Sequence, residues 1–315
     1  MLSVIIPSRV DQYLQATIDD LLAKASGEIE IVVVLDGYWP NPPLKPDRRL
    51  KIVHQGTVHN NLGMRAGINA GIAVAEGELI MKLDEHCMMS QGYDARLAAT
   101  CKQDYLVVPR RYRLDAERWD LTTNTEGDKR PPIDYMYISY PYRKLLDSTS
   151  GLYGAEDKAR YYERKDIEVD DLMTMQGSCW VIRKDYFNKL FPDGLDSANY
   201  GPFNHEAQEL NLTIWLSGGR CVVDKAVWYA HFHKGKKGKG YGFSRAQYRQ
   251  FMADKERARR YAIDYWLNTQ DFKHDWAWLM DKFWPVPTWP DNWPQQLKHD
   301  AQFDWSTKKE PTWQG

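Results

Sequence analysis

Short apolar runs alternate with stretches of helical periodicity through the first hundred residues, and this alternation constrains the fold more than any other feature. Strand-like apolar runs occupy residues 4–6, 28–35, 51–53 and 79–83. Between them, residues 14–22 and 62–75 space their apolar side chains as one face of a helix does. Strands that alternate with helices form β-α-β units, whose strands run parallel because the helix carries the chain back. The sequence therefore predicts an α/β fold with a mostly parallel sheet flanked by helices.

Polar or special residues follow these apolar runs, at the edge where an open α/β sheet carries its ligand site. They include Pro7, Ser8, Asp36, Asp84, Glu85 and His86. Residues two apart on an extended chain point to the same side, so Asp84 and His86 are placed to bind one divalent cation while Glu85 faces away. Strand ends also carry solvated Asp and His that only begin a turn, so the spacing alone leaves both interpretations open.

Length and composition exclude several classes of protein. The 315 residues are 43% hydrophobic, which is enough to bury the core of one large α/β domain with additions. A net charge of −1 argues against a protein that coats nucleic acid indiscriminately. The four cysteines include no Cys-x-x-Cys pair, so we expect reduced thiols rather than disulfides or a zinc site. No apolar segment approaches the roughly 18 residues that span a bilayer, and we expect a cytoplasmic protein.

A nicotinamide-binding domain is a poor match to the glycines of the first half. The segment Gly63-Met64-Arg65-Ala66-Gly67 lacks the tight Gly-x-Gly turn that directly follows a strand in such domains. These glycines instead predict close packing of a helix.

The middle of the chain changes character after the apolar run Leu106-Val107-Val108-Pro109. Residues 110–170 are rich in Tyr, Arg, Asp and Pro with little periodicity, and we expect them to be loops that build an acceptor face. Residues 177–187 predict a glycine turn, a short strand and a helix capped by Asp185. Another helix follows, with Glu206 and Glu209 in its first turn, where the helix dipole alone also favours acidic residues.

The last part of the chain predicts a long helix over residues 244–270 and then a Trp-rich extension. The apolar residues near helical spacing, which predict the buried face of the helix, are Tyr248, Phe251, Met252, Ala258, Ala262 and Tyr265. The extension contains Trp276, Trp278, Trp284, Trp289, Trp293, Trp305 and Trp313. We expect it to wrap the preceding domain, with partner binding and acceptor stacking as alternatives.

Three separated groups of motifs occur in a recognisable order. The first comprises Val4-Ile5-Ile6-Pro7 and Asp36; the second comprises Arg65-Ala66, Gly77 and Leu83-Asp84-Glu85-His86-Cys87. The third comprises Gly177, Tyr186-Phe187, Glu206-x-x-Glu209, Ile214-Trp215-x-x-Gly218-Gly219 and His231-x-His233-Lys234. Together they resemble the catalytic domain of the polypeptide N-acetylgalactosaminyltransferases and the wider group of GT-A glycosyltransferases. The resemblance covers residues 2–234.

The resemblance implies a metal-dependent transfer of sugar from a nucleoside diphosphate, with uridine as the expected base, to a hydroxyl acceptor on a protein or glycan. It implies a GT-A catalytic domain over residues 1–240, with a nucleotide-binding half at 1–95 and an acceptor and metal half at 96–240. A helical Trp-rich extension would occupy residues 241–315. The expected cofactor is Mn²⁺, or Mg²⁺, because such ions stabilise a departing diphosphate.

The same resemblance assigns residues to the donor and the ion. Asp84, His86 and His231 would bind the metal, with His233 as the alternative to His231. The residues expected at the nucleotide sugar are Pro7, Ser8, Asp36, Arg65, Asp84 and Lys234. Pro7 and Ser8 would shape the pocket, Asp36 would bind the base or ribose, and Arg65 would approach the base or diphosphate.

Glu206 is the expected catalytic carboxylate, with Glu209 as the further candidate and Asp196 as another. The family's Gly-Gly before the glutamate is replaced here by Asn204-His205, and the following Asn by Ala207. Stereochemistry and the identity of the sugar therefore stay open.

Two other interpretations stay open. Ten lysines and arginines lie between residues 234 and 260 against two acidic residues. This excess favours either a mobile lid at residues 234–242 or an acceptor that is a hydroxymethylated base of phage DNA. A bacterial or viral origin fits the absence of the family's lectin domain and membrane anchor. The alternative outside enzymes is a non-catalytic nucleotide- or glycan-binding protein with the same fold.

Overall fold

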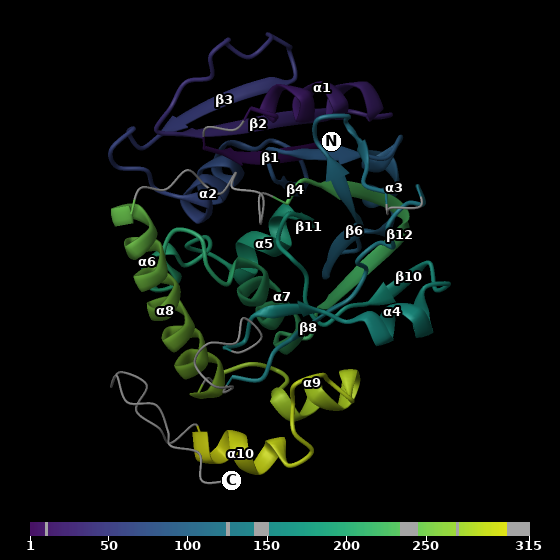
Figure 1. The fold of residues 1–315 in the computed structure, drawn as a ribbon, viewed down its shortest axis with the longest axis vertical. Helices are drawn as coiled ribbons and strands as arrows, with labels where there is room; N and C mark the ends of the chain where they lie inside the picture. The colour runs from purple at the N-terminus through teal and green to yellow at the C-terminus, as the bar shows by residue number, and fades with distance from the viewer. Residues whose placement is uncertain (10–11, 124–126, 142–150, 234–244, 269–270, 301–315) are drawn as a thin grey trace.

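The computed structural model describes residues 1–9, 12–123, 127–141, 151–233, 245–268 and 271–300, which build a central sheet covered by helices (Figure 1). The strands are β1 (Leu2–Ser8), β2 (Ile29–Asp36), β3 (Leu50–Gln55), β4 (Leu79–Leu83), β5 (Cys87–Met89), β6 (Tyr105–Asp115), β7 (Asp120–Leu121), β8 (Met136–Ile138), β9 (Gly154–Glu156), β10 (Val169–Asp171), β11 (Cys179–Arg183) and β12 (Arg220–His231). The helices are α1 (Leu14–Lys24), α2 (Met64–Val74), α3 (Tyr93–Thr100), α4 (Lys158–Arg164), α5 (Lys184–Leu190), α6 (Ser197–Tyr200), α7 (Glu206–Leu216), α8 (Arg245–Asn268), α9 (Trp276–Phe283) and α10 (Trp293–Asp300).

The sheet has the strand order β10-β12-β6-β11-β4-β1-β2-β3, with β5 paired to β12 and β7 paired to β6. Strands β3, β2, β1 and β4 are parallel neighbours, as the alternation of apolar runs and helices predicted. Strand β11 runs antiparallel between β4 and β6, while β6 and β12 are parallel to each other. The predicted mostly parallel sheet flanked by helices is therefore confirmed.

Alternate residues of the parallel strands face two separate cores. Ile5 of β1 and Val34 of β2 belong to one core with Ile68 of α2. Ile6 of β1 belongs to the other core with Ile18 of α1. Both faces of β1 and β2 are thus covered, which is why these two strands carry apolar side chains on both faces.

The expectation of loops over residues 110–170 is wrong in part. Strand β6 extends as far as Asp115 because it pairs with β12, and β8, β9, β10 and α4 follow. Its polar side chains had concealed this strand, since charged residues such as Arg111 and Arg113 alternate along it. The predicted cap of α5 is also wrong, because Arg183 occupies the N-cap position and Asp185 lies in the first turn.

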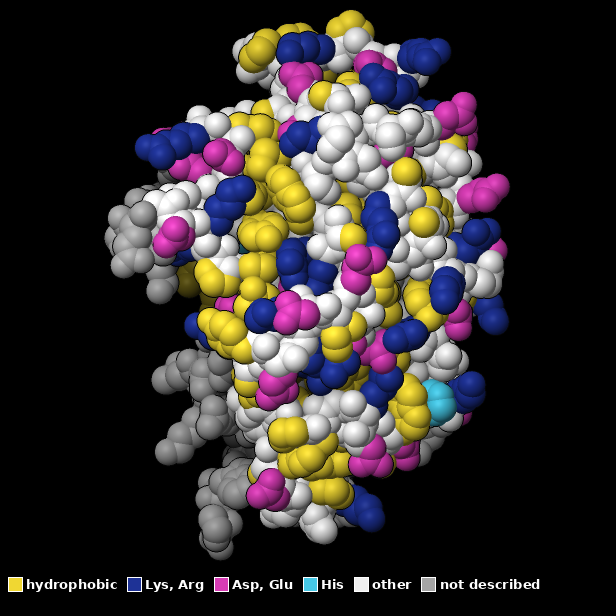
Figure 2. Space-filling view, turned by 90° about the vertical axis from the view of Figure 1, so that its right-hand side faces the viewer, with side chains coloured by type: hydrophobic (Ala, Val, Ile, Leu, Met, Phe, Trp, Pro, Cys, Tyr) yellow, Lys and Arg dark blue, Asp and Glu magenta, His cyan; other side chains and the backbone are white. Residues whose placement is uncertain are grey.

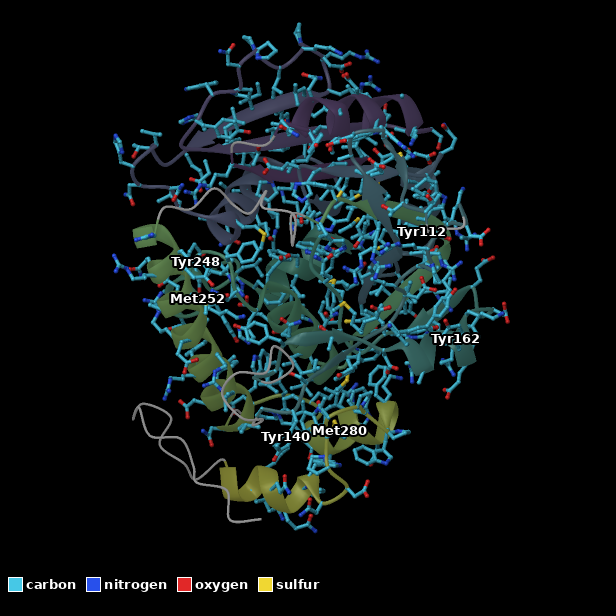
Figure 3. All side chains as sticks on the ribbon, viewed as in Figure 1. Tyr112, Tyr140, Tyr162, Tyr248, Met252 and Met280 are labelled. Carbon is cyan, nitrogen blue, oxygen red and sulfur yellow. The ribbon has the colours of Figure 1, made fainter. Side chains whose placement is uncertain are left out.

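Helix α8 is present as predicted, but only part of its predicted face is buried. Ala258 and Ala262 are buried, whereas Tyr248 and Met252 are 55% and 43% exposed and lie on α8 in Figure 3. Asp254, Ile263, Trp266 and Leu267 complete the buried face.

The Trp-rich segment packs against the rest of the protein. The ring of Trp278 lies 6.0 Å from that of Trp215 on α7. The indole of Trp289 donates a hydrogen bond of 2.7 Å to the carbonyl oxygen of Ile138. Trp305 and Trp313 lie outside the described residues.

Across the described ranges, no helix combines the length and apolar character needed to cross a bilayer. The division of the chain at residues 240 and 241 stays a prediction.

Candidate active site

Asp84, His86 and His231 converge at the carboxyl end of β4. Asp84 directly follows β4, and His86 precedes β5. His231 ends β12, which pairs with β5 in antiparallel register and so brings His231 beside Cys87. Nε2 of His231 lies 3.1 Å from Nε2 of His86 and 3.1 Å from Oδ2 of Asp84. The three ligand atoms all lie within 4.8 Å of one another, a geometry in which one ion can contact all three.

The chemistry of this group fits a divalent cation. Adjacent ligands of an octahedral ion with bonds of about 2.1 Å lie about 3.0 Å apart, which matches the two separations at His231. Burial lowers the pKa of His231 to about 3 despite the opposing effect of Asp84, so its imidazole is neutral and can bind a metal. Two imidazoles and one carboxylate suit Mn²⁺ and other first-row divalent ions.

His233 lies outside the group that converges on a single point. Its ring centroid is 4.7 Å from that of His231 and the two rings are nearly perpendicular. The predicted preference for His231 as the third ligand agrees with this geometry. The full ligand set stays a prediction.

A buried lysine lies behind Asp84. The side chain of Lys82 is 1% exposed, and its ammonium group donates to Oδ1 of Asp84 and, at 2.6 Å, to the carbonyl oxygen of Gly177. The same nitrogen lies 3.9 Å from Oε2 of Glu206. Burial by itself disfavours the charged lysine, but Asp84 and Glu206 outweigh burial and raise its pKa. Lys82 is therefore charged and connects two acidic residues.

The ionisation of Asp84 is favoured by its surroundings. Burial opposes the charged carboxylate, but Lys82, His231 and His86 together outweigh it and hold the pKa well below its usual range. The backbone N–H of Asp84 also donates 2.9 Å to the carbonyl oxygen of Ser178. Asp84 is thus an anion whose main chain and side chain are both held in place.

Glu206 begins α7 and is buried close to this group. Its Oε1 accepts a hydrogen bond of 2.6 Å from the indole N–H of Trp180 on β11. A Cβ at Gly177, where φ is +60°, would lie 2.8 Å from Oε2 of Glu206, so the absent side chain gives the carboxylate its space. Burial raises the pKa of Glu206, although Lys82 and Trp180 oppose the shift. Its catalytic role stays a prediction.

Glu209 and Arg65 bind each other in the interior. The fully buried guanidinium of Arg65 forms an ion pair with Glu209, donates 2.9 Å to the carbonyl oxygen of Asn204, and lies 4.6 Å from the ring centroid of Tyr200. The backbone N–H of Asp196 donates 3.1 Å to the other oxygen of Glu209. These contacts favour a structural role for both residues, and their predicted roles at the donor and in catalysis stay untested.

The residues expected at the nucleotide lie along the ends of β1 and β2. Asp36 accepts hydrogen bonds from the backbone N–H groups of Leu62 at 2.9 Å and Gly63 at 2.7 Å, and so orders the turn that begins α2. Pro7 lies beside α2, because a Cβ on Gly67 would be 3.0 Å from the Pro7 Cβ. Lys234 and the predicted lid at residues 234–242 lie outside the described residues.

Sequence reasoning missed two interactions beside the candidate metal ligands Asp84 and His86. The hydroxyl of Ser8 donates to Glu85, whose carboxylate also accepts the backbone N–H of Arg9 at 2.9 Å. Glu85 is therefore buried and turned toward β1. Lys82 was read as one residue of an apolar run, although a charge inside such a run is itself a signal of a buried ionic partner.

His205 occupies the N-cap of α7 in the left-handed region, with φ 54°. The resembled family has glycine here, which adopts this conformation without strain. The His205 ring makes a hydrogen bond of 2.9 Å to the carbonyl oxygen of Gly151 and packs 4.1 Å from the ring of Tyr153. The side chain of His205, which a glycine would lack, therefore packs against Gly151 and Tyr153.

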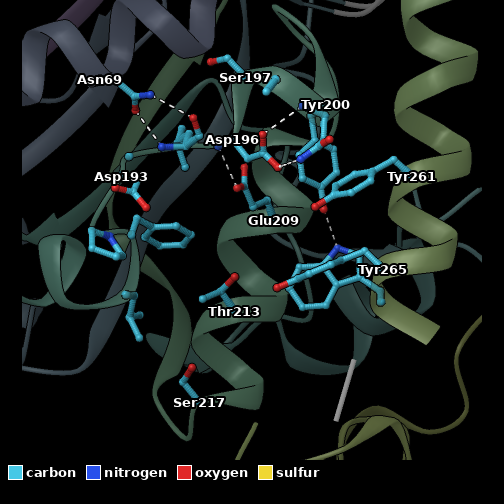
Figure 4. A pocket seen from close by; sticks show the side chains of 18 of the residues that line it. Asn69, Asp193, Asp196, Ser197, Tyr200, Glu209, Thr213, Ser217, Tyr261 and Tyr265 are labelled. Carbon is cyan, nitrogen blue, oxygen red and sulfur yellow. Dashed lines mark hydrogen bonds between the residues drawn. The ribbon is translucent and has the colours of Figure 1, made fainter. Parts of the chain in front are cut away.

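A separate cavity of ≈ 700 Å³ lies between α7, α8 and residues 189–200 (Figure 4). Its lining residues do not include the metal-binding group. Asn69 exchanges hydrogen bonds with the backbone of Leu195, and Glu209 is held by Arg65 and Asp196. These hydrogen bonds hold the cavity walls together, and the group at Asp84 is the candidate active site.

Comparisons with known proteins identify the family of the chain. The family model described as glycosyl transferase family 2 matches residues 3–191. The uncharacterized glycosyltransferase EpsJ of Bacillus subtilis (strain 168) is 29% identical over 113 residues, which are 34% of this chain and 32% of that protein. This chain therefore matches about a third of the length of that curated relative.

Two solved structures are similar to this chain. The crystal structure of GalNAc-T7 with UDP, GalNAc and Mn²⁺ matches with a TM-score of 0.63 and 15% identity, covering 96% of this chain and 54% of that one. Staphylococcus aureus TarS 1-349 in complex with UDP-GlcNAc matches with a TM-score of 0.48 and 17% identity, covering 86% of this chain and 68% of that one. The likeness to GalNAc-T7 confirms the predicted GT-A fold. Because the family model covers more than half of the sequence, the chain belongs to glycosyl transferase family 2.

Proposed function

We propose that the chain transfers a sugar from a uridine diphosphate sugar to a hydroxyl group of a protein or glycan, and that it requires Mn²⁺ or Mg²⁺. The observation that carries the proposal is the convergence of Asp84, His86 and His231 at the end of β4. The fold is that of GalNAc-T7, a protein solved with UDP, GalNAc and Mn²⁺, and this likeness supports the choice of donor and metal.

Each part of the site would have a distinct task. Asp84, His86 and His231 would hold the ion, which when bound stabilises the charge that develops on the departing diphosphate. Asp36 and Ser8, at the ends of neighbouring strands, would border the nucleotide. Glu206 would position the sugar or the acceptor hydroxyl, because its buried carboxylate lies 3.9 Å from the Lys82 ammonium group, which also pairs with Asp84.

A screen of nucleotide sugars tests this function directly. Thermal shift and donor hydrolysis would be measured with several UDP sugars, with and without Mn²⁺, for the wild type and for Asp84→Ala. We expect stabilisation and turnover that need both the ion and Asp84. Stabilisation by no nucleotide, or equal turnover in Asp84→Ala, would contradict the proposed chemistry.

The acceptor decides between two candidate functions. The basic composition of residues 234–260 favours a hydroxymethylated base in DNA. Within α8, however, Arg257 pairs with Asp254 at 3.1 Å and Arg260 pairs with Glu256 at 2.7 Å, so part of the charge is compensated. Figure 2 presents the face of the molecule away from α8, where Lys and Arg are interspersed with Asp and Glu. Mass analysis of peptide, glycan and hydroxymethylated DNA acceptors would distinguish the two.

A further inference from the structure

Lys82 occupies a position where an apolar side chain would be expected. It lies within β4, whose residues are all buried, between Met81 and Leu83. A buried ammonium group is costly unless its hydrogen bonds are satisfied, and a hydrophobic residue of similar volume commonly stabilises a protein more. The presence of a charge here therefore calls for a reason connected with the groups that it contacts.

Those contacts divide the two oxygens of Asp84 between different partners. Oδ1 accepts from the ammonium group of Lys82, whereas Oδ2 lies 3.1 Å from Nε2 of His231. The same ammonium group is anchored to the carbonyl oxygen of Gly177 at 2.6 Å. Gly177 belongs to the turn that enters β11, so Lys82 ties the carboxylate to a neighbouring strand.

We propose that Lys82 is a positioning residue of the transferase site. By holding Oδ1, Lys82 leaves only Oδ2 of Asp84 to face a metal ion, and so keeps other coordination positions open for diphosphate oxygens. Its nitrogen also lies 3.9 Å from Glu206, which places that carboxylate and Asp84 around one buried charge. This inference rests on the proposed function, because it needs a metal ion at Asp84.

Positioning and simple charge compensation predict opposite changes in metal affinity. If Lys82 only neutralised Asp84, its removal would tighten the binding of Mn²⁺, because a positive charge near the cation would be gone. If Lys82 positions Asp84, its removal lets the carboxylate rotate away from the site, and binding weakens. Groups that orient a metal ligand typically contribute about 10- to 100-fold to metal affinity.

Isothermal titration calorimetry with Mn²⁺ alone, without nucleotide, tests the inference on the full chain. We expect Lys82→Met to weaken Mn²⁺ binding by about 10-fold or more. Equal or tighter binding in Lys82→Met, with wild-type binding that depends on Asp84, overturns the inference and leaves the proposed function standing. Absence of Mn²⁺ binding by the wild type overturns both.

Lys225 provides a matched control for the loss of a buried lysine. It is also buried, and donates 2.7 Å to the hydroxyl of Tyr135 and 2.7 Å to the carbonyl oxygen of Ile167. Lys225 lies on β12 six residues before His231, roughly 20 Å along an extended strand. Lys225→Met should lower the melting temperature while leaving Mn²⁺ affinity unchanged.

If Lys82→Met does not fold, Lys82→Gln keeps the measurement decisive. Its side chain is one atom shorter and uncharged, so it loses the fixed hold that the ammonium group has on both Asp84 and the carbonyl oxygen of Gly177. Binding of Mn²⁺ by Lys82→Gln that is weaker than that of the wild type supports positioning, since charge removal alone acts in the other direction. Binding that is as tight as that of the wild type, or tighter, overturns it.

Discussion

The imidazole rings of His86 and His231 face each other with their Nε2 atoms 3.1 Å apart, although 145 residues separate them in the sequence. Two ring nitrogens at this separation can form one hydrogen bond between them, whereas a metal ion could contact both. The same His231 nitrogen also lies 3.1 Å from the carboxylate of Asp84. The geometry therefore favours an ion over a network of hydrogen bonds alone.

Loss of His231 should remove most of the affinity for Mn²⁺. We expect His231→Ala to weaken binding by more than the roughly 10- to 100-fold that losing a supporting group costs. His233→Ala is the matched control, because its ring lies beside that of His231 but outside the converging atoms. Calorimetric titration of both variants gives the comparison. A larger loss in His233→Ala would make His233 the third ligand.

Replacement of the carboxylate at the start of α7 should separate binding from transfer. Glu206→Gln retains the size of the side chain and the hydrogen bond that one of its oxygens accepts from Trp180. We expect near-normal donor affinity and a loss of transfer of about 10²- to 10⁴-fold. Binding by calorimetry and transfer by mass analysis would be measured with the same donor. Normal transfer would leave Glu206 as a structural residue and return attention to Glu209 and Asp196.

The buried pair of Arg65 and Glu209 should act on stability. Arg65→Met leaves Glu209 buried without its ionic partner, and breaking such a pair typically costs about 3–5 kcal/mol of unfolding free energy. The double variant Arg65→Met with Glu209→Leu removes both charges and should recover much of this loss. Urea unfolding measures all three proteins. An unchanged stability in Arg65→Met together with weaker UDP binding would instead support the predicted contact between Arg65 and the donor.

Acid should destabilise the protein partly through His205. Burial lowers the pKa of His205 to about 3 from an ordinary value of 6.5, so between these values the unfolded chain binds a proton that the native state does not. The contribution of this group is therefore complete above about pH 6.5 and is lost as the pH falls toward 3. His205→Asn, which tolerates the positive φ, should flatten the pH dependence of the unfolding free energy by up to one proton. An unchanged slope in urea unfolding between pH 7 and pH 4 would contradict this assignment.

Sequence patterns predicted the first half of the fold well because its strands and helices are each marked by residues close together in the sequence. Each parallel strand from β1 to β4 is an apolar run, and Asp84 and His86 lie two residues apart, so their common side follows from the geometry of extended chain. Their partner His231 came only from the resemblance to a family. Nothing local to residue 231 indicates that β12 will pair with β5.

Other failed predictions share one cause. A charged side chain can be buried when its partner lies far away in the sequence, and sequence patterns do not show such partners. Arg111 interrupts the hydrophobic pattern of β6, yet it is buried and donates 2.6 Å to the side chain of Gln176. Lys82 is similar within β4. On α8, the spacing predicted one buried face along the whole helix, but among the predicted residues only Ala258 and Ala262 are buried, and Trp266 joins them in the core.

Strand β12 has a consequence for how the protein matures. Its last residue pairs with β5 on one side and with β6 on the other, so His231 reaches Asp84 only after the strands from both halves of the sequence have assembled. A growing or partly unfolded chain therefore has no complete set of ligands, and an ion would be captured by the finished sheet alone. Only folded molecules would then bind the metal, and a bound ion would stabilise the native state by linking two parts of the chain that are distant in sequence.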